Sequence, residues 1–113
     1  MIKKIEKPWG FEKLIEINDS YMFKLLYMKK NHRCSLQYHN YKTETLFIVS
    51  GKLRVLIGTD KNNLEIKEFN ANESITIEKK IIHRMEAIED TYYLESSSPE
   101  IDDVVRIQDD YNR

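Results

Sequence analysis

Residues 37–51 read Gln37-Tyr-His-Asn-Tyr-Lys-Thr-Glu-Thr-Leu-Phe-Ile-Val-Ser-Gly51, and this segment is the most informative part of the chain. Side chains two residues apart on a β-strand share a face, so Gln37 and His39 point the same way. Glu44 opens an apolar run that ends at Gly51. The pattern predicts two strands joined by a short connection, with an amide oxygen, an imidazole and a carboxylate where they meet. Such groups can bind a divalent cation of intermediate hardness.

A second imidazole, His83, follows far downstream in the sequence Ile81-Ile82-His83-Arg84. The spacing of His39 and Glu44 is a weak signal by itself, because residues of these types are also common at solvated strand ends. The residues alone therefore leave a metal site and a metal-free polar pocket both open.

The order of these residues resembles the two metal-binding motifs of the cupin superfamily. In the first motif Asn31 stands where cupins usually have Gly, and Gln37 stands where they have the first His. In the second motif only His83 matches, since Glu78 and Lys80 replace the usual Pro and Gly. The resemblance implies an all-β fold, a cupin jelly-roll barrel of two antiparallel sheets. It also implies one divalent metal cation (Zn, Mn, Fe, Co or Ni), held by Gln37, His39, Glu44 and His83.

Gln in place of the first His is typical of one subgroup, the C-terminal domain of type II mannose-6-phosphate isomerases, which is often fused to a mannose-1-phosphate guanylyltransferase. The similarity to that domain extends over nearly the whole chain and is carried by Lys7–Gly10, Ser35–His39, Asp102–Arg106 and Asp109–Arg113. It implies a metal-dependent isomerisation of a sugar phosphate, aldose to ketose. The guanylyltransferase part has no counterpart in these residues.

Further site residues follow from the resemblance and from strand parity. Lys24 is flanked by Met22 and Leu26 on the face predicted to point inward, where it either extends to solvent or meets an anion. The family's domain has a Lys at this place, so Lys24 is predicted to belong to the catalytic site and to bind the phosphate of the substrate. Glu95 matches a Glu of the family and is predicted to act as the proton-transfer base, the alternative being a strand-end residue in water. Ser35 shares the parity of Gln37 and is predicted to contact substrate.

The C-terminal segment supplies candidate phosphate ligands. Arg106, with Arg113 as the other tail arginine, is predicted to bind the phosphate bidentately, although a surface salt bridge with a nearby Asp is the more usual role. Arg84 follows His83 directly, so alternation points it away from the ligands and predicts a structural role. Trp9 is predicted to pack as a core or interface aromatic, with sugar stacking as the alternative.

Three residues depart from the isomerase-type motif. Lys42, Thr45 and Leu46 stand where that motif has Arg, His and Trp. Lys42 keeps the charge but loses the planar fork of arginine, and Thr45 removes an imidazole. These departures leave the exact sugar open.

The bulk composition excludes several classes of function. With 113 residues we expect one domain, residues 1–113. The net charge of −1 provides no general attraction for nucleic acid or anionic lipid. The single cysteine, Cys34, excludes an internal disulfide and a multi-cysteine zinc site. The lack of a signal peptide or apolar span favours a cytoplasmic protein.

Short alternating runs with Asn and Asp turns between them predict many short strands. The expected strands are 11–17, 21–28, 52–57, 64–69, 73–77, 82–87 and 92–95, in addition to those around residues 37–49. Only the terminal stretch 102–109 has a pattern that would fit a helix. A homodimer is expected, because small barrels with exposed strand edges often pair across a two-fold axis.

Three functions compete at this stage. The first is a sugar-phosphate isomerase, with a small-molecule sugar phosphate as the partner. The second is another conversion of a sugar or nucleotide sugar in surface-polysaccharide synthesis. The third is a sugar-binding or regulatory cupin without catalysis.

Overall fold

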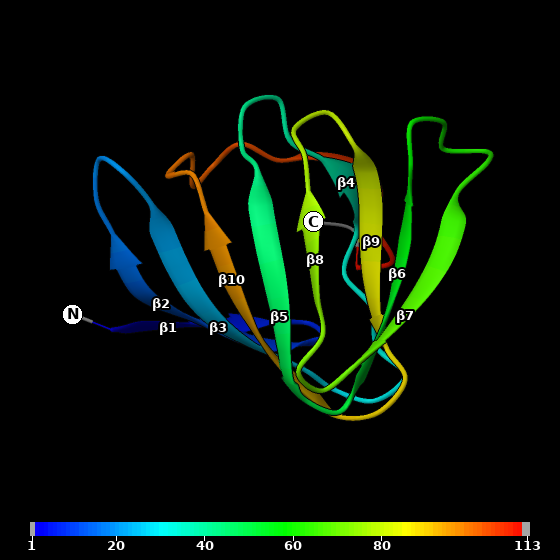
Figure 1. Cartoon of the computed structure of the whole chain (residues 1–113), viewed down its shortest axis with the longest axis horizontal. Helices are drawn as coiled ribbons and strands as arrows, with labels where there is room; N and C mark the ends of the chain where they lie inside the picture. Colours follow the sequence, from blue (N-terminus) through cyan, green and yellow to red (C-terminus); the bar gives the residue numbers. More distant parts are fainter. Residues whose placement is uncertain (1, 112–113) are drawn as a thin grey trace.

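A computed structural model describes residues 2–111, which form two antiparallel β-sheets packed face to face (Figure 1). The strands in chain order are β1 Lys3–Lys7, β2 Gly10–Ile17, β3 Met22–Met28, β4 Leu36–Tyr38, β5 Glu44–Ser50, β6 Lys52–Gly58, β7 Glu65–Asn70, β8 Ser74–Ile77, β9 Ile82–Ala87, β10 Thr91–Ser97 and β11 Val105–Gln108. The predicted jelly-roll barrel is confirmed.

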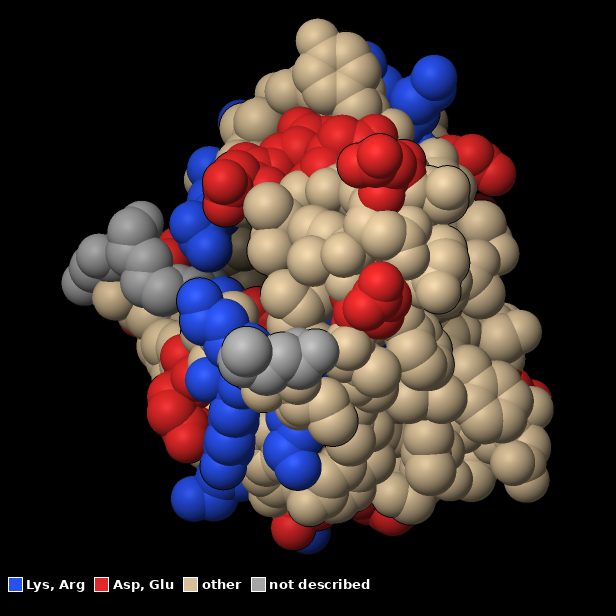
Figure 2. All heavy atoms as spheres, turned by 90° about the vertical axis from the view of Figure 1, so that its left-hand side faces the viewer, with Lys and Arg blue, Asp and Glu red and all other residues tan. Residues whose placement is uncertain are grey.

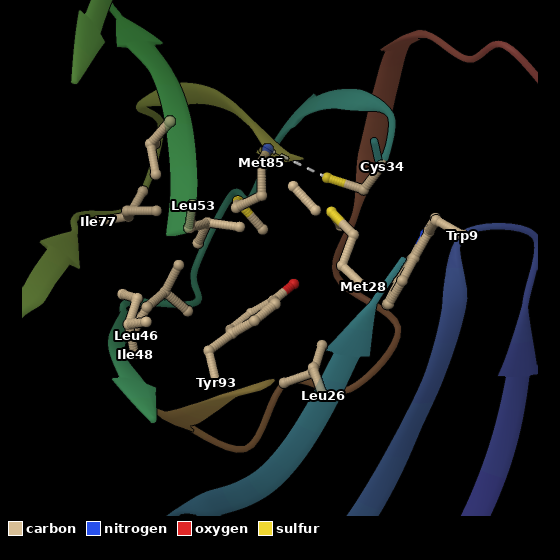
Figure 3. Packing of buried hydrophobic residues seen from close by; sticks show 12 residues of the cluster. Trp9, Leu26, Met28, Cys34, Leu46, Ile48, Leu53, Ile77, Met85 and Tyr93 are labelled. Carbon is tan, nitrogen blue, oxygen red and sulfur yellow. Dashed lines mark hydrogen bonds between the residues drawn. The ribbon is translucent and has the colours of Figure 1, made fainter. Parts of the chain in front are cut away.

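The larger sheet has the order β1-β2-β3-β10-β5-β8, and the smaller one has the order β11-β4-β9-β6-β7. Strands distant in sequence therefore pair, as β10 does with both β3 and β5. The core lies between the sheets, where Figure 3 shows Leu26, Leu46, Met85 and Tyr93 packed among others. After β10 the chain crosses the top of the barrel in Figure 1 and joins the smaller sheet as β11 beside β4.

Strand β3 illustrates why the sequence forms this sheet. Its residues alternate between fully buried and half-buried positions, with Met22, Lys24, Leu26 and Met28 on the inner face. The predicted inward parity of Lys24 is thus confirmed. The same alternation in β5 buries Leu46 and Ile48 and leaves Phe47 and Val49 exposed on the outer face.

Two parts of the strand assignment were wrong or missed. The stretch whose pattern would fit a helix, residues 102–109, instead contains β11, which pairs with β4. Its apolar residues fit a strand because Val105 and Ile107 are half-buried while Arg106 and Gln108 are exposed. Strand β1 was not predicted, since a five-residue segment with one apolar residue, Ile5, has no clear period. It forms because its backbone pairs with β2 along its whole length.

Two residues at the motif positions of glycine have backbone conformations that suit glycine. Asn31 and Lys80, which replace Gly in the motifs, have φ angles of 66° and 72°. This left-handed region is open to Gly, is visited by Asn and is costly for Lys. Both turns therefore use a conformation that glycine would adopt at less cost.

Replacing Gly51 with alanine is expected to destabilise the fold by at least about 2 kcal/mol. Gly51 has a φ of 92°, and an added Cβ would lie 2.2 Å from the carbonyl oxygen of Asp90. Gly58→Ala is the matched control, because the nearest contact of its Cβ would be 3.2 Å from a Leu64 side-chain atom. Urea unfolding should place the control within about 1 kcal/mol of the wild type. Equal losses for both variants would contradict the prediction.

The outer face of the larger sheet carries an aromatic cluster. The ring of Tyr27 lies 5.4 Å from that of Phe11 and 4.9 Å from that of Tyr92, between ring centroids. On this side of the molecule Figure 2 shows a broad area with few charged side chains, while lysines and arginines gather along one border.

The expected homodimer stays a prediction. Within residues 2–111 there is no helix of the length and apolarity needed to cross a membrane.

Candidate metal centre and cavity

Three predicted metal ligands come together at one end of the barrel. His39 follows β4, Glu44 begins β5, and His83 lies in β9. One ligand atom from each lies within 4.8 Å of the others, and all three residues are buried. Glu44 Oε1 is 3.1 Å from His83 Nε2 and 3.7 Å from His39 Nε2. The two sheets thus bring residues 44 positions apart in the sequence to one point.

The orientation of both imidazoles fits metal binding. His83 Nδ1 donates to the carbonyl of Ile81 at 2.9 Å, and His39 Nδ1 donates to the carbonyl of Asp103. A neutral imidazole that donates from Nδ1 has a lone pair on Nε2, which is the arrangement of a metal-ligating histidine. Glu44 Oε1 and His83 Nε2 have no hydrogen-bond partner among the described residues although both are buried. Two acceptors this close repel one another unless a proton or a cation lies between them, so the donor set fits a divalent cation.

Gln37, the fourth predicted ligand, lies beside this group. It pairs in register with His83 across β4 and β9. It also lines a cavity between the sheets together with His39 and Glu44. Its amide nitrogen faces Cys34 Sγ at 3.7 Å. Ligation by Gln37 stays a prediction.

Lys42 connects the candidate metal-binding group, which consists of His39, Glu44 and His83, to Glu95. Its Nζ lies 3.4 Å from Glu44 Oε2 and 3.2 Å from Glu95 Oε2, and all three side chains are less than a tenth exposed. Burial alone would lower the pKa of Lys42, but the two carboxylates raise it, so the ammonium stays charged. Burial and the charge of Glu44 together raise the pKa of Glu95 despite the lysines nearby. For Glu95, the alternative of a strand-end residue in water is therefore wrong.

Lys24 also lies in the cavity, but with a partner that the sequence did not suggest. Its Nζ is 3.1 Å from Glu12 Oε2, and Lys7 Nζ is 3.3 Å from Glu12 Oε1. Burial alone would raise the pKa of Glu12, and the two lysines outweigh it and lower that pKa. Lys24 therefore has a carboxylate partner within the protein and does not need a substrate anion to balance its charge. One carboxylate between two ammonium groups still leaves this cluster with an excess of positive charge.

Asp103 connects the segment between β10 and β11 to the loop between β4 and β5, which contains His39. Its carboxylate accepts hydrogen bonds from the backbone N–H groups of Asn40, Tyr41 and Lys42, at 3.0, 2.7 and 3.0 Å. Its carbonyl accepts from His39, as described above. Asp103 therefore orients one ligand and holds the C-terminal segment over the site at the same time.

Two further predicted site residues, Ser35 and Arg106, line this cavity, which has a volume of about 650 Å³. Ser35 is buried in its wall, and Arg106 is exposed at its border. Arg106 forms no ion pair with a residue in the range 2–111, where Asp110 pairs with Arg33 at 2.6 Å instead. Arg113 lies outside the described residues.

Arg84 is buried behind the smaller sheet. It donates to the carbonyl of Cys34 at 2.8 Å and to that of Gln108 at 3.2 Å. The structural role predicted for Arg84 is confirmed.

Sequence reasoning missed three residues of the cavity, Glu12, Lys42 and Asp103, as parts of the site. Lys42 was noted only as a departure from the family motif. Asp103 lies in a segment noted for its similarity, but its three backbone contacts are too distant in sequence to be inferred. One sequence signal for Glu12 was available. Glu12 and Leu14 are two residues apart in one strand and so share a face, and an inward face for Leu14 would have placed Glu12 inward as well.

The two-sheet barrel with a buried imidazole and carboxylate group at one end defines the protein as a cupin. The family model described as "Mannose-6-phosphate isomerase C-terminal" matches residues 1–109, so the chain belongs to that family.

The curated relatives include a mannose-1-phosphate guanylyltransferase and a xanthan biosynthesis protein. The chain is 31% identical over 123 residues to the mannose-1-phosphate guanylyltransferase ManC of Salmonella typhimurium, covering 100% of this chain and 24% of that protein. It is 28% identical over 116 residues to the xanthan biosynthesis protein XanB of Xanthomonas campestris, covering 98% of this chain and 24% of that protein. The chain thus spans about a quarter of the length of these relatives.

Solved structures share the fold at low sequence identity. KdgF from Halomonas sp. superposes with a TM-score of 0.77 at 15% identity, covering 88% of this chain and 90% of that chain. A variant of the Bacillus subtilis oxalate decarboxylase OxdC superposes with a TM-score of 0.83 at 13% identity, covering 94% and 30%. At such identities the likeness concerns the fold alone.

Proposed function

We propose that this cupin isomerises a sugar phosphate between its aldose and ketose forms. The observation that carries the proposal is a buried carboxylate, Glu95, which lines the same cavity as His39 and Glu44, two members of the group suited to a metal ion. A carboxylate with a raised pKa is suited to moving a proton between neighbouring carbons through an enediol. The family and the relatives named above support a sugar-phosphate ligand.

The residues around the cavity would have two roles, metal binding and proton transfer. His39, Glu44 and His83, with Gln37, would hold the metal, which when bound polarises a carbonyl and its neighbouring hydroxyl. Glu95 lies on β10 of the larger sheet, and Lys42 holds its carboxylate in place. Lys24 stands opposite Glu95 in the register of β3 and β10, so it supplies a positive charge beside the base.

The charges that line the cavity suit a dianion. Five cationic side chains, Lys3, Lys7, Lys24, Lys42 and Arg106, balance five acidic ones, Glu12, Glu44, Glu95, Asp102 and Asp103. A bound divalent cation leaves an excess of two positive charges, which matches a phosphate monoester. The hydrated phosphate group belongs near the exposed Arg106 and Lys3, and Figure 2 shows cationic side chains bordering a hollow on this side of the molecule.

Turnover of hexose and pentose phosphates by pure metal-loaded protein tests the proposal, with mannose 6-phosphate assayed first. Interconversion of at least one aldose and ketose pair is the expected result. Failure of every sugar phosphate to react, with metal bound, would overturn the isomerase and leave a binding protein.

A nucleotide-sugar conversion is the second candidate. The cavity volume of about 650 Å³ lies in the range that takes ligands larger than a hexose phosphate, which favours this alternative. The expected cytoplasmic location and the homodimer stay predictions for either function.

Arg106→Gln is expected to raise KM for the phosphorylated sugar by about tenfold or more while changing kcat little. The guanidinium at the cavity border would bind phosphate in the ground state and the transition state alike, and such charge-assisted bonds contribute about 1.5–3 kcal/mol. Arg54→Gln is the matched control, because Arg54 pairs with Glu68 at 3.2 Å outside this cavity. Steady-state kinetics measures both variants, and an unchanged KM in Arg106→Gln would exclude this residue as the phosphate ligand.

A further inference from the structure

Two neutral hydrogen-bonding groups in the cavity lack partners. Trp9 Nε1 and Tyr93 Oη are buried and have no hydrogen-bond partner among the described residues. Trp9 is 5% exposed and Tyr93 is 0% exposed, and both line the cavity that contains the metal-binding group. Buried polar groups of native proteins are nearly always hydrogen-bonded to protein, water or ligand. Their position in a cavity wall points to a molecule inside the cavity.

Both groups belong to the larger sheet and are firmly positioned. Tyr93 lies on the inner face of β10, paired in register with Leu26 of β3 and Ile48 of β5. Figure 3 shows its ring extending from β10, with the hydroxyl pointing into the space between the sheets. Trp9 lies in the turn between β1 and β2, where its carbonyl accepts a hydrogen bond from the backbone of Lys29 at 2.8 Å.

The chemistry of the two groups indicates what they bind. An indole N–H only donates and a phenol both donates and accepts, so the pair can bind hydroxyl groups, which also donate and accept. The phenol stays neutral, because burial raises the pKa of Tyr93. Two of the charged donors of the cavity are already paired, Lys24 with Glu12 and Lys42 with Glu95, whereas Arg106 at its border is the one proposed above for the phosphate. Trp9 and Tyr93 are thus suited to the hydroxyl groups of a ligand whose anionic end lies elsewhere.

We propose that Trp9 Nε1 and Tyr93 Oη form a subsite for the hydroxyl groups of a polyhydroxylated carbon chain. This inference rests on the proposed function, since it divides the sugar phosphate into a hydroxylated part inside the cavity and a phosphate at its border near Arg106. The subsite lies on the larger sheet together with Glu95, two residues beyond Tyr93 on the same face of β10. Its hydrogen bonds therefore fix the carbon chain on the wall that carries the base.

The test measures binding without turnover. A linear hexitol 6-phosphate keeps the hydroxyls and the phosphate but has no carbonyl to isomerise, and inorganic phosphate is the second probe. Titration calorimetry on metal-loaded protein should give a dissociation constant for the hexitol phosphate that rises about fivefold in Tyr93→Phe and in Trp9→Phe. Inorganic phosphate should bind equally to all forms. Tyr92→Phe is the matched control, because it makes the same change one residue away on the outer face.

Each outcome separates the subsite from the proposed reaction. Unchanged affinity for the hexitol phosphate in Tyr93→Phe and Trp9→Phe would overturn the subsite even if a sugar phosphate is isomerised, and would assign both groups to bound water. The expected losses together with no turnover of any sugar phosphate would keep the subsite and overturn the isomerase. Wild-type protein that binds the hexitol phosphate no better than inorganic phosphate would also overturn the subsite. Trp9→Phe decides the result if Tyr93→Phe does not fold.

Discussion

Protein in which His39 and His83 are both replaced by alanine is expected to lose its bound divalent metal. The two imidazoles are two of the three grouped ligands, and Glu44 alone, paired with Lys42, does not retain a cation. Elemental analysis of untagged protein should find about one metal per wild-type chain and less than about a tenth of that in the double variant. The chain has one more histidine, His32, whose Nδ1 contacts the carbonyl of Lys30. His32→Ala is the matched control and should keep the metal.

Thermal unfolding gives a second measure of the same prediction. A ligand that binds only the folded state at 100 times its dissociation constant stabilises that state by about 2.7 kcal/mol. Adding metal to the stripped wild-type protein should therefore raise its Tm by several degrees, and the double variant should not respond. Equal metal content in the wild type and the double variant would refute the ligand assignment.

The sequence was most informative where a residue's face follows from its own strand. Ser35, Gln37 and His39 share a parity, and the structure places all three at the cavity. Lys24 was placed on the inner face by the same rule, and the structure confirms it. Parity depends on the pleat of one strand alone, so it needs no knowledge of which strands are neighbours.

Glu12 was missed because the wall of the cavity carries charged side chains where the usual strand pattern places apolar ones. The alternation in residues 11–17 was taken to place apolar side chains inside. The structure instead turns Phe11 outward onto Tyr27 and buries Glu12 between Lys7 and Lys24. A carboxylate is stable there only because partners from two other strands reach it, and one sequence does not specify that pairing.

The three departures from the family motif have different consequences in space. Thr45, which replaces an imidazole, faces away from the cavity, and its hydroxyl lies 2.8 Å from that of Thr76. Leu46 is fully buried in the core. Only Lys42 contacts the metal-binding group, where it keeps the positive charge of the arginine it replaces. From the sequence, Thr45 and Leu46 count against mannose 6-phosphate in particular, and their positions away from the cavity make that argument weaker.

The two buried carboxylates outside the candidate metal group, Glu95 and Glu12, differ in a way that favours Glu95 as the base of the proposed reaction. Burial and Glu44 raise the pKa of Glu95, whereas two lysines lower the pKa of Glu12. Environments that push the pKa values of two acids apart give them different roles, and the acid with the raised pKa is the better proton acceptor near neutral pH. Glu12 stays ionised and serves to hold Lys24 and Lys7.

Glu95→Gln is accordingly expected to lower kcat for the isomerised sugar phosphate by about 10²- to 10⁴-fold with little change in KM. Glutamine keeps the shape of the side chain and an oxygen that can accept from Lys42, so the metal-binding group should be undisturbed and metal content should equal that of the wild type. In D₂O the wild-type protein should exchange the hydrogen next to the substrate carbonyl, and the variant should not. Glu12→Gln is the control with the same chemical change in the same cavity, and it should retain the exchange. Retained exchange in Glu95→Gln together with its loss in Glu12→Gln would assign the proton transfer to Glu12 instead.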